Sequence, residues 1–532
     1  MRALLVNPEF PDTYWSQKHA LTFVGRDCLL PPLALATVAS LLPKDWELRL
    51  VDMNVEPLHD EQLRAADLVL LTGMLVQRAS LHQVIERCRK LNVRTVVGGP
   101  YATALPDDVD RADHLVLGEG EEIVPRFAAE FAAGRAERVY REEGKPALTS
   151  SPVPRFDLLR PRAYHQMSLQ FSRGCPFSCE FCDIIVMYGR NPRVKTAEQV
   201  VGELEAIRAT GFTGDVFFVD DNFIGNKKAV RSVLPRIAEW RRRTRAPLTF
   251  YTEASMNLAE DGELIDHMAE SGFTAVFLGI ETPSPDSLRE TKKLQNVKGD
   301  PVDRVHAILD RGLDVWGGFI LGFDNDGPDI FDRMIEFVQR AAIPYAMVGL
   351  LGALPNTPLY HRLEREGRLR PISRVKGDQF GLTNVITKLP VEQMLAGYRR
   401  VLETLYSPEV YFERCRENLR RWMPRREGER RVALRELRAG LLSVLRSLRA
   451  PYWDSYWKFL AWTARHEPRK LARAVAQAIV GHHYMTYTRQ TVIPTLEAQL
   501  RQVQLAAARV APFPGPAPAP VRLPVAAGDS SL

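Results

Sequence analysis

The sequence is poor in cysteine and has no apolar run suited to crossing a membrane. It contains 6 cysteines in 532 residues, far too few for a disulfide-stapled fold. The best candidate for a membrane span, residues 341–360, is interrupted by Pro344, Pro355 and Pro358, so we interpret it as a buried strand and its loop. No cleavable leader is visible, because residues 2–7 read directly as a strand. These absences predict a reduced, cytoplasmic protein.

The positive charge is confined to one segment. The net charge is +6, yet between Tyr411 and Ala450 twelve Arg face five Glu, so the rest of the chain is nearly neutral. A basic surface beside aromatic residues suits the anionic inner face of a membrane, where the protein would be peripheral. A solvated helix face that pairs with neighbouring Glu is the alternative, and nucleic-acid binding is a third; we expect no nucleic acid. The densest arginines are Arg414, Arg416, Arg420, Arg421, Arg425, Arg426, Arg430 and Arg431.

Residues 1–140 alternate short apolar runs with amphipathic stretches. This alternation predicts an α/β fold with a doubly wound parallel, Rossmann-like sheet. Turn-formers follow the runs, and ligands of such sheets bind at the carboxyl ends of the strands. A complete Gly-x-Gly-x-x-Gly is missing, which disfavours a standard dinucleotide site. The expected strands are Ala3–Val6, Glu47–Val51, Leu68–Leu71, Thr95–Val97 and His114–Leu117.

A second alternating series follows a polar, proline-bearing linker at residues 141–163. It predicts a partial (β/α)6 barrel over residues 164–390, with its chemistry on the loops after the strands. Residues 391–510 read as a helical domain, and the Pro- and Ala-rich residues 511–532 as a disordered tail. The expected barrel strands are Met167–Phe171, Asp215–Val219, Thr249–Glu253, Ala275–Gly279, Val315–Leu321 and Ala346–Leu350.

Three of the cysteines, Cys175, Cys179 and Cys182, lie within eight residues directly after the first barrel strand. Thiolates are the usual ligands of iron–sulfur clusters. Three of them can hold three irons of a [4Fe-4S] cluster and leave one iron open to a ligand. The alternatives are a zinc site and a chance grouping, but zinc sites usually combine paired Cys or His sets, and the sequence has no partner pair.

The Cys-x-x-x-Cys-x-Phe-Cys pattern resembles the radical S-adenosylmethionine (SAM) superfamily. The resemblance implies that the amino and carboxylate groups of SAM chelate the open iron, and that one-electron reduction of SAM yields a radical that abstracts hydrogen from the substrate. It also implies an electron donor such as flavodoxin or ferredoxin. Phe181 would pack near the adenine. No protein acid or base is required for the abstraction, and we assign no catalytic residue.

Other residues match the superfamily at the ends of later strands. Asp220 and Asp221 follow the second strand, where the methionine amine is expected, although such a pair alone is often only a helix N-cap. Glu253 and Ser255 end the third strand, where ribose or carboxylate contacts are expected. The remaining expected SAM contacts, at the ends of the fourth and fifth strands, are Glu281, Gly318 and Gly322.

The N-terminal sheet before such a barrel resembles that of the cobalamin-binding members of the superfamily. The matching loops contain Asn7, Gly98 with Gly99, and Glu119 with Gly120. The Asp-x-His-x-x-Gly pattern that supplies a histidine to cobalt in other cobalamin proteins is absent, so the lower axial ligand stays unassigned.

The match extends past the barrel to a subgroup with an extra helical C-terminal domain, near the hopanoid 2-methylase group. It implies a C-methyltransferase that moves a methyl group from SAM through methylcobalamin to an unactivated carbon of a lipid-like or secondary-metabolite substrate, such as a hopanoid. One alternative is rearrangement or cyclisation without methyl transfer. Another is a tRNA methylthiotransferase, which would need a second cysteine set upstream, where only Cys28 and Cys88 stand.

Overall fold

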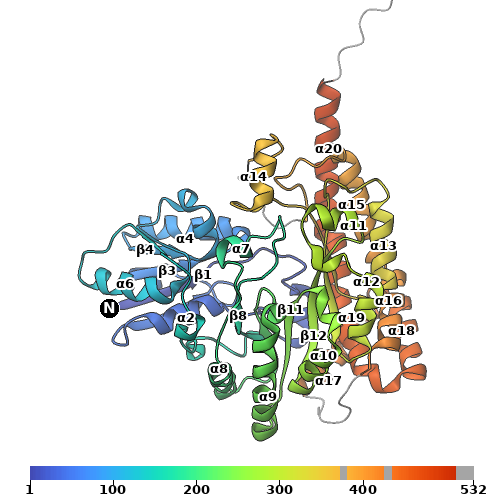
Figure 1. Ribbon diagram of the computed structural model, residues 1–532, viewed down its shortest axis with the longest axis horizontal. Coiled ribbons are helices and arrows are strands. Elements are labelled where there is room, and N and C mark those ends of the chain that lie inside the picture. Colours follow the sequence, from blue (N-terminus) through green and yellow to red (C-terminus); the bar gives the residue numbers. More distant parts are fainter. Residues whose placement is uncertain (372–379, 424–433, 511–532) are drawn as a thin grey trace, which may run out of the picture.

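Two parallel six-stranded sheets and a layer of helices build the molecule, from left to right in Figure 1. The computed structural model describes residues 1–371, 380–423 and 434–510. The tail predicted at 511–532 lies outside the described residues. So do four members of the predicted basic patch, Arg425, Arg426, Arg430 and Arg431.

The N-terminal sheet is parallel throughout, with the order β2-β1-β3-β4-β5-β6. Its central strands are apolar and buried because helices cover both faces. The order reverses at β1, which pairs with both β2 and β3, and such switch points form ligand crevices at the carboxyl ends. The strands are β1 (Arg2–Asn7), β2 (Glu47–Asp52), β3 (Leu68–Thr72), β4 (Thr95–Gly98), β5 (His114–Leu117) and β6 (Val139–Arg141). The helices are α2 (Leu33–Leu41), α3 (Asp60–Arg64), α4 (Arg78–Lys90), α5 (Gly99–Ala104) and α6 (Gly120–Ala132).

Residues 12–24, between β1 and α2, leave this domain and pack against the C-terminal helices. Helix α1 (Lys18–Val24) lies on α19 and α17. The buried Tyr14 shares a 2.6 Å hydrogen bond between its Oη and Oγ1 of Thr488. His483 Nε2 lies 3.2 Å from the carbonyl oxygens of Thr13 and Tyr14. The two ends of the described chain are thus joined by buried polar contacts.

The second sheet is also parallel, with the order β14-β13-β12-β11-β10-β7, and it curls into a half-barrel. Because all of its strands are parallel, their carboxyl ends meet along one edge. The strands are β7 (Gln166–Leu169), β10 (Gly214–Phe218), β11 (Leu248–Ala254), β12 (Phe273–Glu281), β13 (Asp314–Leu321) and β14 (Ala346–Leu350). The helices are α7 (Ile184–Met187), α8 (Ala197–Ala209), α9 (Lys227–Thr244), α10 (Gly262–Ser271), α11 (Pro285–Glu290), α12 (Pro301–Leu309) and α13 (Ile330–Arg340). A short antiparallel ribbon, β8 (Ser172–Arg173) with β9 (Arg193–Val194), flanks the cysteine loop.

The C-terminal region is helical, as predicted, and packs on the outside of the half-barrel. Tyr398, for example, donates a 2.8 Å hydrogen bond to the carbonyl oxygen of Val348 in β14. The helices are α14 (Pro358–Arg365), α15 (Val391–Leu405), α16 (Pro408–Arg421), α17 (Leu434–Ser447), α18 (Trp453–His466), α19 (Leu471–Tyr487) and α20 (Ile493–Val510). The predicted fold class is therefore confirmed in all three parts. None of the described helices is both long and apolar enough to cross a membrane.

The prediction of an exposed basic patch is wrong for Arg414, the first of its arginines. Arg414 is buried on α16, where it donates to the carbonyl oxygen of Leu405 at 3.0 Å and lies over the ring of Tyr411. Arg416 pairs with Glu413 on its own helix at 2.7 Å. Arg420 and Arg421 likewise pair with Glu417, at 3.1 and 3.0 Å. Three of the four described members of the patch therefore pair with glutamates of their own helix, as the alternative interpretation held.

Candidate active site

A cavity of about 290 Å³ opens at the carboxyl edge of the half-barrel. Most of the barrel residues that the sequence analysis predicts as site residues line this cavity. The predicted residues that line it are Cys175, Cys179, Phe181, Cys182, Asp221, Glu253, Ser255, Glu281 and Gly318. Asp220 and Gly322 lie outside its lining, as do the predicted residues of the N-terminal domain.

The three cysteine thiols face this cavity from one loop, and side-chain amides approach two of them. Asn222 Nδ2 lies 3.7 Å from Cys175 Sγ, and Gln295 Nε2 lies 3.6 Å from Cys179 Sγ. Burial raises the pKa of the Cys175 and Cys182 thiols. Among the described residues, no three His, Cys, Asp or Glu side chains are grouped as a single ion requires. Three thiols that line one cavity fit an iron–sulfur cluster, in which each iron takes its own thiolate.

The paired aspartates after β10 hold the cysteine loop in place. Asp220 is buried and accepts hydrogen bonds from the backbone N–H groups of Phe171 and Ser172. Asp221 accepts a 2.9 Å hydrogen bond from the N–H of Gly174 and also lines the cavity. Burial raises the pKa of Asp220 to about 7 and that of Asp221 to about 6. Of the two, only Asp221 is placed to meet a ligand.

An acidic wall continues along β11 and β12. Burial raises the pKa of Glu253 to about 8, and the charges of Asp221 and Asp220 add to the shift. Glu281 has a φ of +69° where the pairing of β12 with β13 shifts register. A left-handed conformation costs a non-glycine residue about 1–3 kcal/mol and often marks a functional site. Both side chains face the cavity.

Lys293, which the sequence analysis missed, is the one cation in the cavity lining of the described residues. It forms a buried ion pair with Glu281 and lies 5.7 Å from the centre of the Phe181 ring. Burial alone would lower the pKa of Lys293, but the Glu281 carboxylate and the sulfurs of Cys179 and Cys182 outweigh it and raise the pKa. Lys293 lies in the segment after α11, next to Lys292, and nothing in the sequence indicates which of the two lysines folds back into the site.

Much of the remaining lining is apolar, and two of its members come from outside the barrel. Trp15, on the segment that leaves the N-terminal domain, packs on Phe277 with ring centres 4.9 Å apart. Phe380 comes from the C-terminal region and packs on Tyr14, also at 4.9 Å. The apolar members are Trp15, Phe177, Ile184, Phe277, Phe319, Ile320, Met347 and Phe380. Periodicity within the barrel could not reveal side chains supplied by distant segments.

The predicted N-terminal residues lie at the carboxyl edge of the first sheet, where polar groups pair among themselves. Asn7 Nδ2 donates to Asp52 Oδ1 at 2.9 Å, and Gln77 Nε2 donates to Asn7 Oδ1 at 3.2 Å. Gly99 has a φ of +86°, and a Cβ there would lie 2.1 Å from Thr72 Oγ1. Gly98 and Gly120 flank the same edge, before α5 and at the start of α6.

Glu119 links the N-terminal domain to the β8–β9 ribbon beside the cysteine loop. Its carboxylate, with a side chain only 2% exposed, pairs with Arg173 at 2.6 Å and with Arg193 at 2.7 Å. Arg173 also pairs with Glu121 at 2.8 Å. Because Arg173 precedes Cys175 by two residues, these pairs tie the N-terminal loop to the loop that would hold a cluster.

The same edge of the N-terminal sheet also presents large apolar side chains. Met74, just after β3, is 51% exposed, and Phe10, just after β1, is exposed as well. A flat corrin ring offers a wide apolar face, so an edge with satisfied polar groups and exposed apolar side chains fits it. The loop after β1 contains no histidine, which leaves the axial ligand unassigned.

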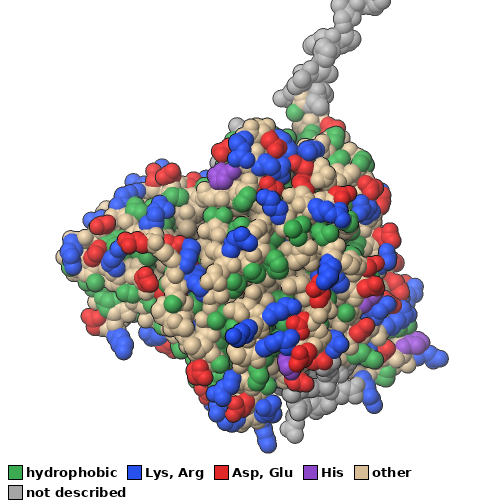
Figure 2. Space-filling view, in the orientation of Figure 1, with side chains coloured by type: hydrophobic (Ala, Val, Ile, Leu, Met, Phe, Trp, Pro, Cys, Tyr) green, Lys and Arg blue, Asp and Glu red, His purple; other side chains and the backbone are tan. Residues whose placement is uncertain are grey.

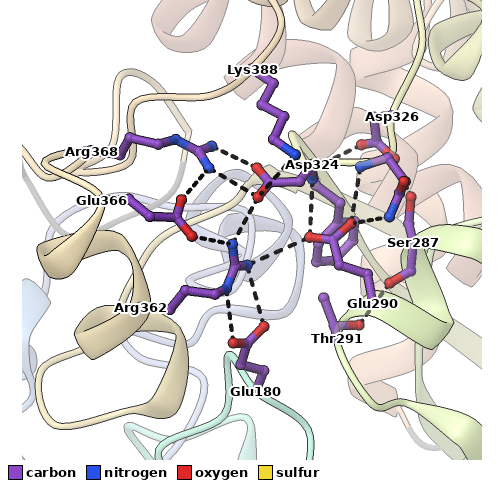
Figure 3. A network of polar contacts seen from close by, with 12 residues as sticks. Glu180, Ser287, Glu290, Thr291, Asp324, Asp326, Arg362, Glu366, Arg368 and Lys388 are labelled. Carbon is purple, nitrogen blue, oxygen red and sulfur yellow. Dashed lines mark hydrogen bonds and ion pairs between the residues drawn. The ribbon is translucent and has the colours of Figure 1, made fainter.

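A charged network holds α14 against the cysteine loop (Figure 3). Arg362 on α14 pairs with Glu180, the residue after Cys179, at 2.9 Å and with Asp324 at 2.8 Å. Arg368 also pairs with Asp324, at 2.6 Å. The chain that follows the half-barrel is thereby fastened to the cluster-binding segment.

Three family models match successive parts of the chain. Residues 26–128 match the B12 binding domain, and residues 169–338 match the radical SAM superfamily. Residues 357–494 match a domain of unknown function (DUF4070).

Known proteins resemble the chain over nearly its whole length. An uncharacterized methyltransferase of Synechocystis sp. is 41% identical, covering 94% of this chain and 94% of its own. The hopanoid C-2 methylase of Rhodopseudomonas palustris is 32% identical, covering 92% of this chain and 94% of its own. The structure of the cobalamin-dependent SAM radical enzyme OxsB with aqua-cobalamin bound superposes with a TM-score of 0.58 at 15% identity, covering 94% of this chain and 81% of that one.

Proposed function

Because the chain belongs to the cobalamin-binding radical SAM family, and within it resembles methyltransferases, we propose that it methylates an unactivated carbon of a lipid-like or secondary-metabolite substrate. The methyl group comes from SAM by way of cobalamin. A hopanoid is the first candidate, since the hopanoid C-2 methylase is 32% identical.

One observation carries the proposal: a single cavity contains the three thiols, an acidic wall and a group of aromatic side chains. Asp221, Glu253 and Glu281 suit a ligand with a cationic amine and sulfonium, because buried carboxylates are stabilised by opposite charge. Trp15 and Phe277 suit a hydrocarbon, which gains free energy by leaving water. A site for both SAM and an apolar substrate is what carbon methylation requires.

When bound, the cluster with SAM supplies one-electron chemistry that removes hydrogen from carbon, and cobalamin supplies methyl transfer. The residues of the chain bind and orient. Cys175, Cys179 and Cys182 would hold the cluster. Asp221, Glu253, Ser255, Glu281 and Gly318 would contact SAM, and Phe181 would pack on its adenine.

Two further residues support this arrangement. Lys293 fixes the Glu281 carboxylate, and Trp15 covers the cavity and excludes water. Proton transfer by a side chain is not needed for hydrogen abstraction, so no acid or base is assigned.

For the cobalamin, we propose the carboxyl edge of the N-terminal sheet around Asn7, Gly98, Gly99, Glu119 and Gly120. A one-electron donor such as flavodoxin or ferredoxin would reduce the cluster. Peripheral contact with an anionic membrane would give access to a lipid substrate.

The test is anaerobic reconstitution with iron, sulfide and hydroxocobalamin, followed by turnover with SAM carrying a deuterated methyl group and a hopanoid. We expect a product heavier by one labelled methyl group, and none from the Cys175/Cys179/Cys182 triple alanine variant. A product of unchanged mass would refute methyl transfer and indicate rearrangement or cyclisation. Iron binding without cobalamin binding would refute the methylcobalamin route.

A further inference from the structure

Helix α17 turns its large apolar side chains towards solvent. Leu437, Leu441, Leu445 and Leu448, the last just past its end, are each between 53% and 60% exposed. At about 100° per residue these positions share one narrow face of the helix. Four leucines in one exposed row are unusual, because a surface helix normally buries its apolar stripe.

The buried face of α17 has the opposite character. Ala439, Ser443 and Ser447 are buried, and Ser443 Oγ shares a 3.0 Å hydrogen bond with Tyr456 Oη on α18. Helix α17 packs through this side on α1 and α19. Leu442 also packs on this side, against the cluster that contains Ala20, Phe23 and Ile479. Intramolecular packing thus accounts for Leu442 but does not explain the four exposed leucines.

Exposed tryptophans also occur on α18, which contacts α17 through the Ser443–Tyr456 hydrogen bond. Trp453 is 55% exposed and Trp457 is also exposed. Tryptophan is enriched where one end of a side chain is apolar and the other is wet, as at membrane–water interfaces. We call Leu437, Leu441, Leu445, Leu448, Trp453 and Trp457 the leucine ridge.

The charge around the ridge is positive. Between Leu437 and Lys458 the chain has four basic residues and one acidic residue, Asp454. Arg438 and Arg449 are exposed and, by helical geometry, flank the leucines. By contrast, basic and acidic side chains are interspersed over the face seen in Figure 2. An apolar row with basic side chains beside it complements a partner that has an apolar interior and an anionic surface.

We propose that the leucine ridge docks the enzyme on an anionic lipid bilayer, with α17 lying in the plane of the interface. Leucines would enter the acyl boundary, the tryptophans would sit at the headgroup level, and the arginines would meet anionic headgroups. This surface differs from the basic patch expected from the sequence, whose described arginines pair with glutamates or are buried.

The ridge is connected to the cavity through α1. Arg446 of α17 lies 4.4 Å from the centre of the Phe23 ring. Trp15, three residues before α1, lines the cavity. Docking would therefore place α17 between the bilayer and α1, the helix that follows this cavity-lining side chain. The proposal assigns a surface to the membrane contact of the proposed function, and it does not depend on which molecule is methylated, since docking is measured without turnover.

The experiment is flotation of the full-length, reconstituted protein with phosphatidylglycerol vesicles and with phosphatidylcholine vesicles. We expect binding to phosphatidylglycerol and at least about tenfold weaker binding to phosphatidylcholine. The Leu441→Gln/Leu445→Gln double variant should bind phosphatidylglycerol at least about tenfold more weakly. The matched control is Leu505→Gln, which changes an equally exposed leucine on α20 and should bind as the wild type does. Arg438→Gln/Arg449→Gln should weaken binding and reduce its dependence on salt.

Several outcomes would overturn the proposal. They are no binding to phosphatidylglycerol vesicles, equal binding to both lipids, and a double leucine variant that binds as tightly as Leu505→Gln. A wild type that is dimeric by light scattering, with a monomeric leucine variant, would assign the ridge to a second copy instead. Methylation of detergent-dispersed substrate should be unchanged in the leucine variant. Failure of docking and failure of the proposed reaction are therefore read out separately.

Discussion

The two parallel sheets end in edges of opposite character. At the N-terminal edge, Asn7, Asp52 and Gln77 satisfy one another, and Met74 is left exposed. At the half-barrel edge, three carboxylates and one ammonium group line the cavity, and burial raises the pKa of Glu253 to about 8.

This difference shows how two parallel six-stranded sheets suit different cofactors. An edge with an excess of buried carboxylates is stabilised by a cationic ligand and is strained without one. An edge whose polar groups are already paired gains little from a charged ligand, but its exposed apolar side chains gain from a large ring. SAM fits the first edge and cobalamin the second.

The largest effect that separates the edges should come from Cys179→Ala. We expect iron to fall from about four per chain to almost none, with loss of SAM cleavage, while cobalamin content stays the same. Metal analysis and visible absorption of the reconstituted protein measure both. Cys28→Ser, at a cysteine outside the cavity, is the control and should keep its iron. Joint loss of iron and cobalamin would contradict two independent edges.

The next largest effect should come from Arg173→Met, which removes the ion pairs of Arg173 with Glu119 and Glu121 and leaves the pair of Glu119 with Arg193. It leaves Glu119 and Glu121, with side chains 2% and 3% exposed, without this partner. Breaking a buried pair costs about 3–5 kcal/mol. Urea unfolding should show this loss, together with weaker cobalamin retention. Arg155→Met breaks an exposed pair with Asp157 and should cost less than about 1 kcal/mol. Equal losses of unfolding free energy in the two variants would show that the ion pairs of Arg173 do not stabilise the protein.

Glu253→Gln tests the acidic edge through pH. The pKa of Glu253 is raised from an ordinary value of 4.5 to about 8, so the folded apoprotein holds a proton between these values that the unfolded chain has lost. Wild-type stability therefore falls as pH rises through this window. Glutamine does not titrate. The stability of the variant relative to the wild type should therefore rise with pH up to about pH 8 and stay constant above it. Thermal midpoints from about pH 5 to about pH 9 measure the difference.

A control for this titration is Glu263→Gln, at an exposed carboxylate on α10. Its difference from the wild type should not follow the same rise. A Glu253→Gln difference that is flat or decreases with pH would mean that Glu253 is already stabilised in its ionised form.

The smallest effect on stability should come from Met74→Ala. Because Met74 is exposed, its removal should change the free energy of unfolding by no more than about 0.5 kcal/mol. Cobalamin retention after gel filtration should nevertheless fall severalfold. Val139→Ala removes another exposed apolar side chain, at the amino end of β6, and should leave retention unchanged. Equal retention in both variants would remove the apolar edge from cobalamin binding.

Much of the fold could be predicted because its signals are local. The apolar runs that the sequence presents became strands within one or two residues of their expected ends, as for β3 and β5. The short β6 was missed, since three residues with one buried side chain do not form a distinct apolar run. The domain limits at 140, 163, 390 and 510 stay predictions.

Residues of the candidate site could be predicted where their position depends only on the end of a strand. Cys175 and Glu253 could be placed because the first follows a strand of a parallel barrel and the second lies at the carboxyl end of one. Asp220 shares that position, yet its carboxylate bonds backbone N–H groups, and which of two adjacent aspartates faces a cavity depends on loop geometry. Trp15 and Lys293 were missed because long-range packing, and not spacing, brings them in. The roles of all these residues towards SAM and cobalamin stay predictions.

The buried contacts of Tyr14 with Thr488 and of Thr13 with His483 also have a consequence for biosynthesis. Trp15 is among the first residues made, but the helix that fixes its segment is among the last. During translation, both cofactor domains can be complete before this helix is made. A chain that ended at residue 390 would keep every predicted cofactor ligand and the contact of Trp15 with Phe277, but it would lose the buried partners of Thr13 and Tyr14. The C-terminal helices are therefore the last part of the chain to be made that supports this wall of the cavity.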